Sequence, residues 1–201
     1  WKKAGVWGDF ALFRKPTMFR HPMPLTEGVP LRVFRTDPAE GRYEILDATL
    51  LAIRGARKRI WIENPYFAHD DIARALVGAA RRGVDVRVIL PAGGDSAIMD
   101  SGNLATSNGL IRAGAKVFQY PKMTHMKVMI CDDWASIGSA NFDTLSMRIN
   151  RELNLAFSHK ASVMELEKKV FLPDFKRSRK IRLPETKSAT DGFAEAIADQ
   201  L

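Results

Sequence analysis

Short apolar runs alternate with helical repeats of apolar residues from about residue 30 to residue 172. β-Branched and aliphatic runs are typical of buried strands, and apolar residues three or four positions apart are typical of helices that pack on a sheet. Their alternation indicates an α/β domain with a central sheet flanked by helices. The expected strands are residues 31–35, 59–63, 84–90, 115–120, 126–132, 135–138 and 151–157.

Helical spacing predicts a helix through Leu46, Leu50 and Ile53, between the first two strands. Residues 91–102 contain several Gly and Asp residues without a period, so a loop is expected there, before a helix that ends near Gly114. The other expected elements are a helix that begins at Asp70 or Asp71 and stops at Gly83, a short turn or helix between Asn141 and Ile149, and a final helix through Val163, Leu166 and Val170.

The chain has 201 residues, which is enough for one domain with terminal extensions. Residues 30–172 are expected to form that domain, with residues 1–29 as a linker or extension and residues 173–201 as a C-terminal extension. No apolar run is long enough for a membrane span and no signal peptide is recognisable, so a cytoplasmic or peripheral membrane location is expected. The net charge of +8 favours an anionic partner.

One polar pair stands out at the start of the expected strand 126–132. Side chains two positions apart on an extended segment point the same way, so His125 and Lys127 are expected side by side. An apolar stretch then leads to Asp132 and anchors the polar end in the sheet. A nucleophile thus has a cation as its neighbour.

Two further segments supply groups that suit this pair. Ser139 and Asn141, two positions apart after the next strand, are neutral donors for an oxyanion. Glu152 opens the following strand and offers a carboxylate that would orient the imidazole of His125 by a hydrogen bond. The residue types therefore fit a site in which an oriented imidazole acts as a nucleophile beside groups that stabilise negative charge.

The string HMKVMICD followed by GSANFD resembles the HxKxxxxD motif and the trailing GSxN of the phospholipase D superfamily. The segments RIWIENPYFAHDDIARAL and NFDTLSMRINRELNLAF also look like the corresponding parts of bacterial cardiolipin synthases, in particular their C-terminal catalytic half. The resemblance covers roughly residues 30–172. One departure is a spacer between Asp132 and Gly138 that is one residue shorter than the common pattern, which we interpret as a shortened hairpin turn.

The resemblance implies a central mixed sheet flanked by helices, forming one catalytic half of a pseudo-two-fold or homodimeric site. Two histidines then share the work: one attacks phosphorus to give a phosphohistidine, and the other protonates the leaving alcohol. Which role belongs to His125 stays open, and no metal or other cofactor is expected. The implied catalytic residues are His125, Lys127, Asp132 and Glu152, and the implied phosphate-binding residues are Lys127, Ser139 and Asn141.

Two positions qualify this picture. Asp132 faces away from Lys127 by strand parity, so within the motif we expect it to have a structural hydrogen-bonding role. Residues 1–5 resemble the end of a first phospholipase D half, which leads to the hypothesis that the chain is the second half of a longer enzyme.

Three functions fit these observations. The leading hypothesis is an enzyme acting on phospholipid diesters, whose partners would be a second catalytic half and an anionic membrane surface. A single-motif nuclease that works as a homodimer is the alternative within enzymes, with nucleic acid as substrate. A non-catalytic module that binds anions is the third, although the intact set of His125, Lys127 and Asn141 argues against it.

Overall fold

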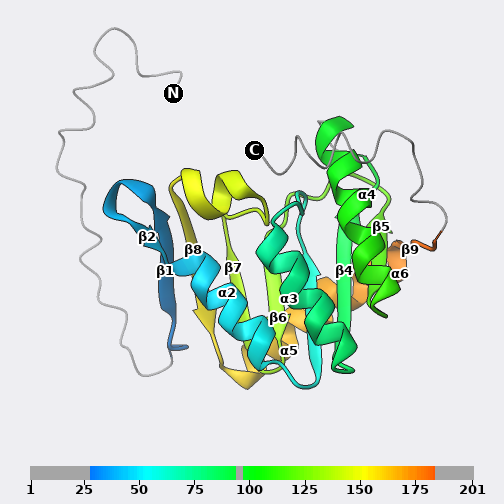
Figure 1. Ribbon diagram of the computed structural model, residues 1–201. Coiled ribbons are helices and arrows are strands. Elements are labelled where there is room, and N and C mark those ends of the chain that lie inside the picture. Colours follow the sequence, from blue (N-terminus) through cyan, green and yellow to red (C-terminus); the bar gives the residue numbers. More distant parts are fainter. Residues whose placement is uncertain (1–27, 94–96, 184–201) are drawn as a thin grey trace, which may run out of the picture.

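The computed structural model describes residues 28–93 and 97–183. A single mixed sheet runs through this part of the chain (Figure 1). Its strands are β1 (Arg32–Asp37), β2 (Arg42–Tyr43), β3 (Arg59–Glu63), β4 (Asp85–Pro91), β5 (Lys116–Tyr120), β6 (Val128–Cys131), β7 (Trp134–Gly138), β8 (Glu152–Phe157) and β9 (Arg179–Lys180).

The strand order is β2-β1-β8-β7-β6-β3-β4-β5-β9. β3, β4 and β5 are parallel neighbours, and the remaining pairs are antiparallel. Parallel neighbours need crossover connections, and the helices that supply them cover one face of the sheet. The crossover helices are α3 (Asp70–Arg81) and α4 (Ala97–Arg112), and α2 (Glu44–Gly55), which connects β2 to β3, lies on the same face, in front of the sheet in Figure 1.

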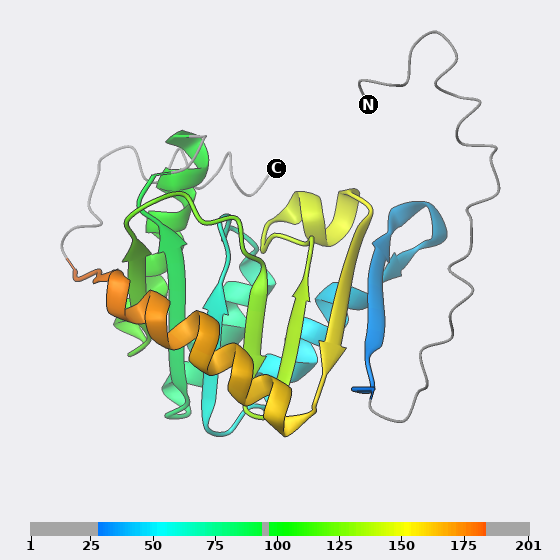
Figure 2. The same cartoon turned by 180° about the vertical axis from the view of Figure 1, so that it is seen from behind.

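The opposite face carries one long helical rod, which crosses the strands obliquely (Figure 2). The rod consists of α5 (Lys160–Leu166), a π-helical stretch (Glu167–Phe171) and α6 (Leu172–Arg177). A second π-helical turn, Leu145–Ile149, lies between β7 and β8. The sheet is therefore the middle layer of three.

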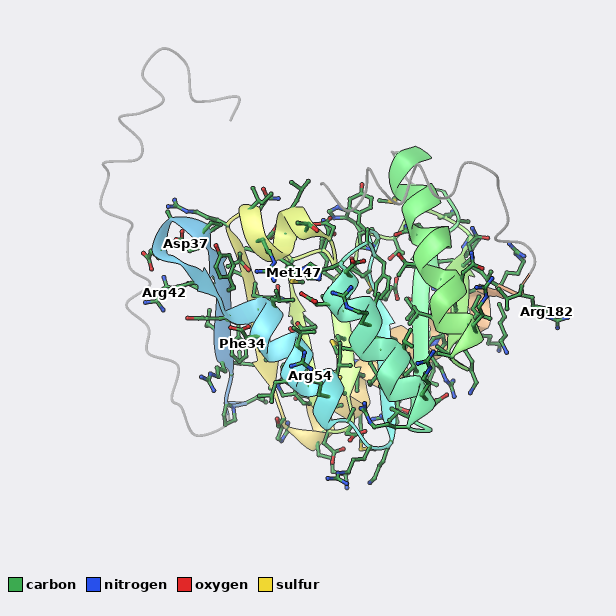
Figure 3. All side chains as sticks on the ribbon, in the orientation of Figure 1. Phe34, Asp37, Arg42, Arg54, Met147 and Arg182 are labelled. Atoms are coloured by element: carbon green, nitrogen blue, oxygen red, sulfur yellow. The ribbon has the colours of Figure 1, made fainter. Side chains whose placement is uncertain are left out.

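Alternation along β3 shows how both faces are buried. Ile60 and Ile62 belong to the core under α2 and α3, while Trp61 belongs to the core under the rod. The Trp61 ring meets Phe175 edge-on with 5.3 Å between ring centroids. Figure 3 shows Phe34 on β1, where it packs against the first of these cores. A strand buried on both faces is apolar along its centre, here Ile60 to Ile62, which is why it was readable from the sequence.

The architecture confirms the prediction of an α/β fold with a central mixed sheet flanked by helices. Three local predictions were wrong. α4 begins at Ala97, inside the segment expected to be a loop, because Ser, Gly and Asn residues disguise its periodicity. β6 begins at Val128 and not at residue 126, because its partner β3 ends at Glu63.

The third difference lies at the C-terminal end. The boundary expected at residue 172 falls where α6 begins, and β9 beyond it pairs with β5. Ile181 is only 3% exposed and belongs to the core. The folded unit thus includes part of the expected extension, while residues 1–27 and 184–201 lie outside the described residues.

Candidate active site

The segments singled out in the sequence meet at one end of the sheet. Glu63 at the end of β3 pairs with Val128 at the start of β6, and Gly138 at the end of β7 pairs with Asn154 near the start of β8. Residues that precede β6, follow β7 or open β8 therefore lie at the same end of the strands. We call this end of the sheet the site edge. This edge lies at the top of Figure 1.

His125 and Lys127 lie in an extended segment just before β6. His125 is exposed, and its ring makes no hydrogen bond with any residue in the described ranges. Lys127 is half-buried, and its Nζ donates to the His125 carbonyl oxygen at 3.1 Å. Burial lowers the pKa of Lys127, while the charges of Glu152 and Asp143 act in the opposite direction. The ammonium group thus lies in the field of two carboxylates.

Ser139 and Glu152 are joined directly across β7 and β8. Ser139 Oγ donates a hydrogen bond to Glu152 Oε2 and accepts one from the Leu153 amide at 3.0 Å. The Glu152 carboxylate is thus bonded to Ser139 in this structure, and not to the imidazole of His125. Its role in orienting that ring stays a prediction.

Asn141 follows β7 at the same edge. Its side-chain oxygen Oδ1 is buried and has no hydrogen-bond partner among the described residues. Buried polar atoms are almost always paired, so an unpaired amide oxygen at such an edge is a candidate acceptor for a hydrogen-bond donor of a ligand.

Asp143 is a site residue that sequence reasoning missed. Its side chain is buried, and its Oδ1 accepts a hydrogen bond from the Ser146 amide at 2.7 Å. Burial raises the pKa of Asp143, the bonds from Ser146 lower it, Glu152 raises it and Lys127 lowers it. The available signal was its position two residues after Asn141, although a capping role for the following turn explains the same position.

Asp132 lies at the other end of β6, away from this edge. Its carboxylate accepts hydrogen bonds from the amides of Arg57, Lys58 and Arg59, each at 2.9 Å. Although burial opposes it, these three bonds hold the pKa of Asp132 below its ordinary value. Asp132 also has a φ of 52° in the two-residue turn between Cys131 and Trp134. The structure therefore separates Asp132 from the other predicted site residues and uses it to join β6 to the start of β3.

Comparison with known proteins agrees with this fold. A family described as "Cardiolipin synthase, PLD-like domain" matches residues 50–171. Cardiolipin synthase A of Pseudomonas entomophila is 37% identical over 157 residues, which is 77% of this chain and 33% of the relative. The probable cardiolipin synthase YwiE of Bacillus subtilis is 34% identical over 166 residues, 81% of this chain and 33% of the relative. The chain thus spans about a third of the length of these relatives.

A solved structure of a phospholipase D family member has a similar fold. Nuc from Salmonella typhimurium, described as a phospholipase D family member, superposes with a TM-score of 0.66 at 25% identity. The match covers 77% of this chain and 99% of that chain.

The mixed sheet flanked by helices and the match to Nuc show a phospholipase D-like fold. The chain belongs to the cardiolipin synthase-type, phospholipase D-like family. Within residues 28–93 and 97–183, no helix combines the length and apolar character needed to span a membrane.

Proposed function

We propose that this chain supplies one catalytic half of an enzyme that acts on phospholipid diesters by phosphatidyl transfer or hydrolysis. The observation that carries the proposal is the common end of the strands at which His125 and Lys127 precede β6 and Asn141 follows β7; among the described residues the His125 ring has no hydrogen-bond partner, and Lys127 Nζ bonds the His125 carbonyl oxygen. The relatives named cardiolipin synthase support a lipid substrate over other phosphodiesters.

In the proposed reaction an imidazole nitrogen attacks phosphorus, an N–P bond forms, and the P–O bond to the leaving alcohol breaks. A second, protonated imidazole gives its proton to the leaving oxygen. A water or an alcohol then attacks phosphorus, the N–P bond breaks, and the second imidazole takes the proton. His125 supplies one of these two imidazoles.

The other groups have electrostatic and positioning roles in this proposal. A diester carries a negative charge that repels an attacking lone pair, so Lys127 Nζ and Asn141 Nδ2 would donate hydrogen bonds to the non-bridging oxygens and stabilise the charge that develops there. Ser139 and Glu152 form the linked pair behind these groups. Glu152 would exchange this bond for one to the His125 ring when substrate binds.

In this proposal the second imidazole comes from another catalytic half. We propose that this half belongs to the same full-length protein or to a second copy, because the chain corresponds to about a third of its cardiolipin synthase relatives. The site edge at the top of the sheet is where the two halves would face each other.

The test incubates the full-length protein with phosphatidylglycerol, phosphatidylcholine and DNA, in wild-type and His125→Ala forms. We expect turnover of a phospholipid by the wild type and a loss of at least about 1,000-fold in the variant, because no other group replaces the imidazole. Wild-type turnover that survives the substitution would remove His125 from the mechanism.

A nuclease is the second candidate, and two observations favour it. Nuc is matched over 99% of its length, so a protein of this size class carries the same fold, and the present chain has a net charge of +8. Binding of DNA that weakens steeply with salt, together with DNA cleavage and no lipid turnover, would support this candidate. Binding of anionic vesicles without any turnover would instead support a non-catalytic module.

A further inference from the structure

Glu63 is a buried carboxyl group directly behind the His125 segment. It is the last residue of β3 and is 1% exposed. Thr124 Oγ1 donates a hydrogen bond to Glu63 Oε1 at 2.5 Å, across 61 residues of sequence. The other oxygen, Oε2, has no hydrogen-bond partner among the described residues. Since Thr124 precedes His125, this bond fixes the backbone next to the imidazole.

The surroundings of Glu63 favour its neutral form. Burial raises the pKa of Glu63 to about 7 although the bond from Thr124 lowers it, and the Asp174 carboxyl on α6 raises it further. The residues paired with Glu63 on the two neighbouring strands, Ile89 and Val128, carry no charge. Arg177 Nη1 donates a hydrogen bond to Asp174 Oδ1 at 3.5 Å. A protonated Glu63 can therefore accept the Thr124 hydrogen bond without repelling Asp174.

Asn64 holds the second segment of the site, residues 140–142, through hydrogen bonds of its side chain. Its side chain is 1% exposed, Nδ2 donates to the Ala140 carbonyl at 3.4 Å, and Oδ1 accepts from the Phe142 amide at 3.3 Å. These two backbone groups flank Asn141. The amides of Ala68 and His69 then bond the Phe142 carbonyl at 2.8 and 2.9 Å. Residues 64–69 after β3 thus form hydrogen bonds with the backbone on both sides of Asn141.

We propose that Glu63 and Asn64 are the positioning residues of the site: Glu63 holds the His125 segment through Thr124, and Asn64 holds the Asn141 segment through Ala140 and Phe142. The His125 segment precedes β6 and the Asn141 segment follows β7. Because both are bonded to the end of β3, we infer that this end sets the distance between them. This inference rests on the proposed function only in that it gives His125 and Asn141 catalytic tasks. Small displacements of such groups cost large factors in rate, so residues that fix their backbone affect turnover without touching the substrate.

The test compares variants of the full-length protein by steady-state kinetics and by amide hydrogen exchange. Thr124→Val removes the hydroxyl at nearly constant volume, and Thr124→Ser restores it. Glu63→Gln keeps the accepting oxygen. Ser107→Ala is the matched control, because it removes another buried hydroxyl, which donates to the Asn103 carbonyl at 2.6 Å within α4.

We expect Thr124→Val to lower kcat about 10- to 100-fold with KM within about threefold of wild type, because binding groups remain while the imidazole is misplaced. Amide exchange in residues 124–127 is expected to accelerate in this variant. Thr124→Ser, Glu63→Gln and Ser107→Ala are expected to stay within about threefold of wild type in kcat. Asn64→Leu is expected to accelerate exchange in residues 140–142, provided that it folds.

The proposal is overturned if Thr124→Val keeps wild-type kcat and wild-type exchange in residues 124–127, or if Ser107→Ala lowers kcat as much. An unfolded Asn64→Leu leaves the decision to the Thr124 pair. If the wild type turns over no substrate, the proposed function fails. Amide hydrogen exchange alone then decides whether Glu63 and Asn64 hold residues 124–127 and 140–142 in place.

Discussion

At the residue scale, the site is a small set of charges at a half-buried edge. The Lys127 ammonium lies in the field of Glu152 and Asp143, and both carboxylates counter the effect of burial on its pKa. A cation that must neutralise a phosphodiester has to stay protonated at the working pH. In the proposed function, the carboxylates at this edge therefore help Lys127 to keep the charge that a phosphodiester needs.

Asp143→Asn tests this relation. The amide oxygen of Asn can still accept the Ser146 hydrogen bond, but the negative charge is gone, so the pKa of Lys127 is expected to fall further. The alkaline limb of the kcat/KM profile should move to lower pH, while the acid limb stays in place. Profiles of wild type and variant measured over the same range check this, and coincident alkaline limbs would show that Asp143 does not act on Lys127.

Glu63 makes a prediction about stability. Its pKa is raised from an ordinary 4.5 to about 7 in the folded chain, so its contribution to stability is fully present below pH 4.5 and is lost as the pH rises to about 7. Between these limits the wild type should lose up to about 3 kcal/mol relative to Glu63→Gln. Urea unfolding of both proteins at pH 5 and pH 8 measures this difference. A difference independent of pH would mean that Glu63 is ionised throughout.

At the element scale, the readable parts of the sequence were those with a strong period. Strand β3 was predicted with its observed limits, because Ile60, Trp61 and Ile62 are all buried. By contrast α4 was recognised only in its second half, since Gly102 and Gly109 interrupt its pattern. Asn64 and Glu63 were missed as supports of the site because their partners are 61 to 78 residues away in sequence.

The close approach of β8 explains why the GSAN segment begins with glycine, Gly138. A Cβ at this position would overlap the side chain of Asn154 and the carbonyl of Leu153 on β8. Gly138→Ala should therefore force β7 and β8 apart, disturb the Ala140–Asn154 hydrogen bond and destabilise the fold by about 2–4 kcal/mol. Thermal unfolding checks the stability, and Ala135→Gly in the interior of the same strand is the control for a change in backbone freedom. A Gly138→Ala protein with wild-type stability would refute the close approach.

Asp132 joins two elements, and its prediction separates structure from chemistry. Asp132→Ala removes three hydrogen bonds to the amides of residues 57–59, so we expect a loss of about 2–3 kcal/mol in the free energy of unfolding. Because the carboxylate lies at the far end of β6, kcat per folded molecule should remain within about threefold of wild type. Asp133→Ala, at the adjacent turn position, is the control. A large loss of kcat in a stably folded Asp132→Ala protein would return Asp132 to the catalytic residues.

At the scale of the whole molecule, the sequence predicted which groups gather at one edge better than how they bond there. The positions of Lys127, Ser139 and Asn141 follow from strand ends, which a period of two reveals. The bond between Ser139 and Glu152 depends on how β7 and β8 twist together, and no local pattern encodes it. The extent of the folded unit was also hidden, because the basic sequence around β9 has no apolar alternation.

The proposed reaction needs a second imidazole beside His125, and mixing experiments distinguish the two sources of the second. Wild-type and His125→Ala proteins are unfolded together and refolded at equal concentrations. If each site uses His125 from two copies of the chain, random pairing leaves about a quarter of the sites intact, and the specific activity falls on dilution as dimers dissociate. If the second imidazole belongs to the same full-length chain, about half the activity remains and dilution has no effect. The cardiolipin synthase relatives, of which this chain spans 33%, lead us to expect the second result. Activity near one quarter would instead establish a site shared between two identical copies.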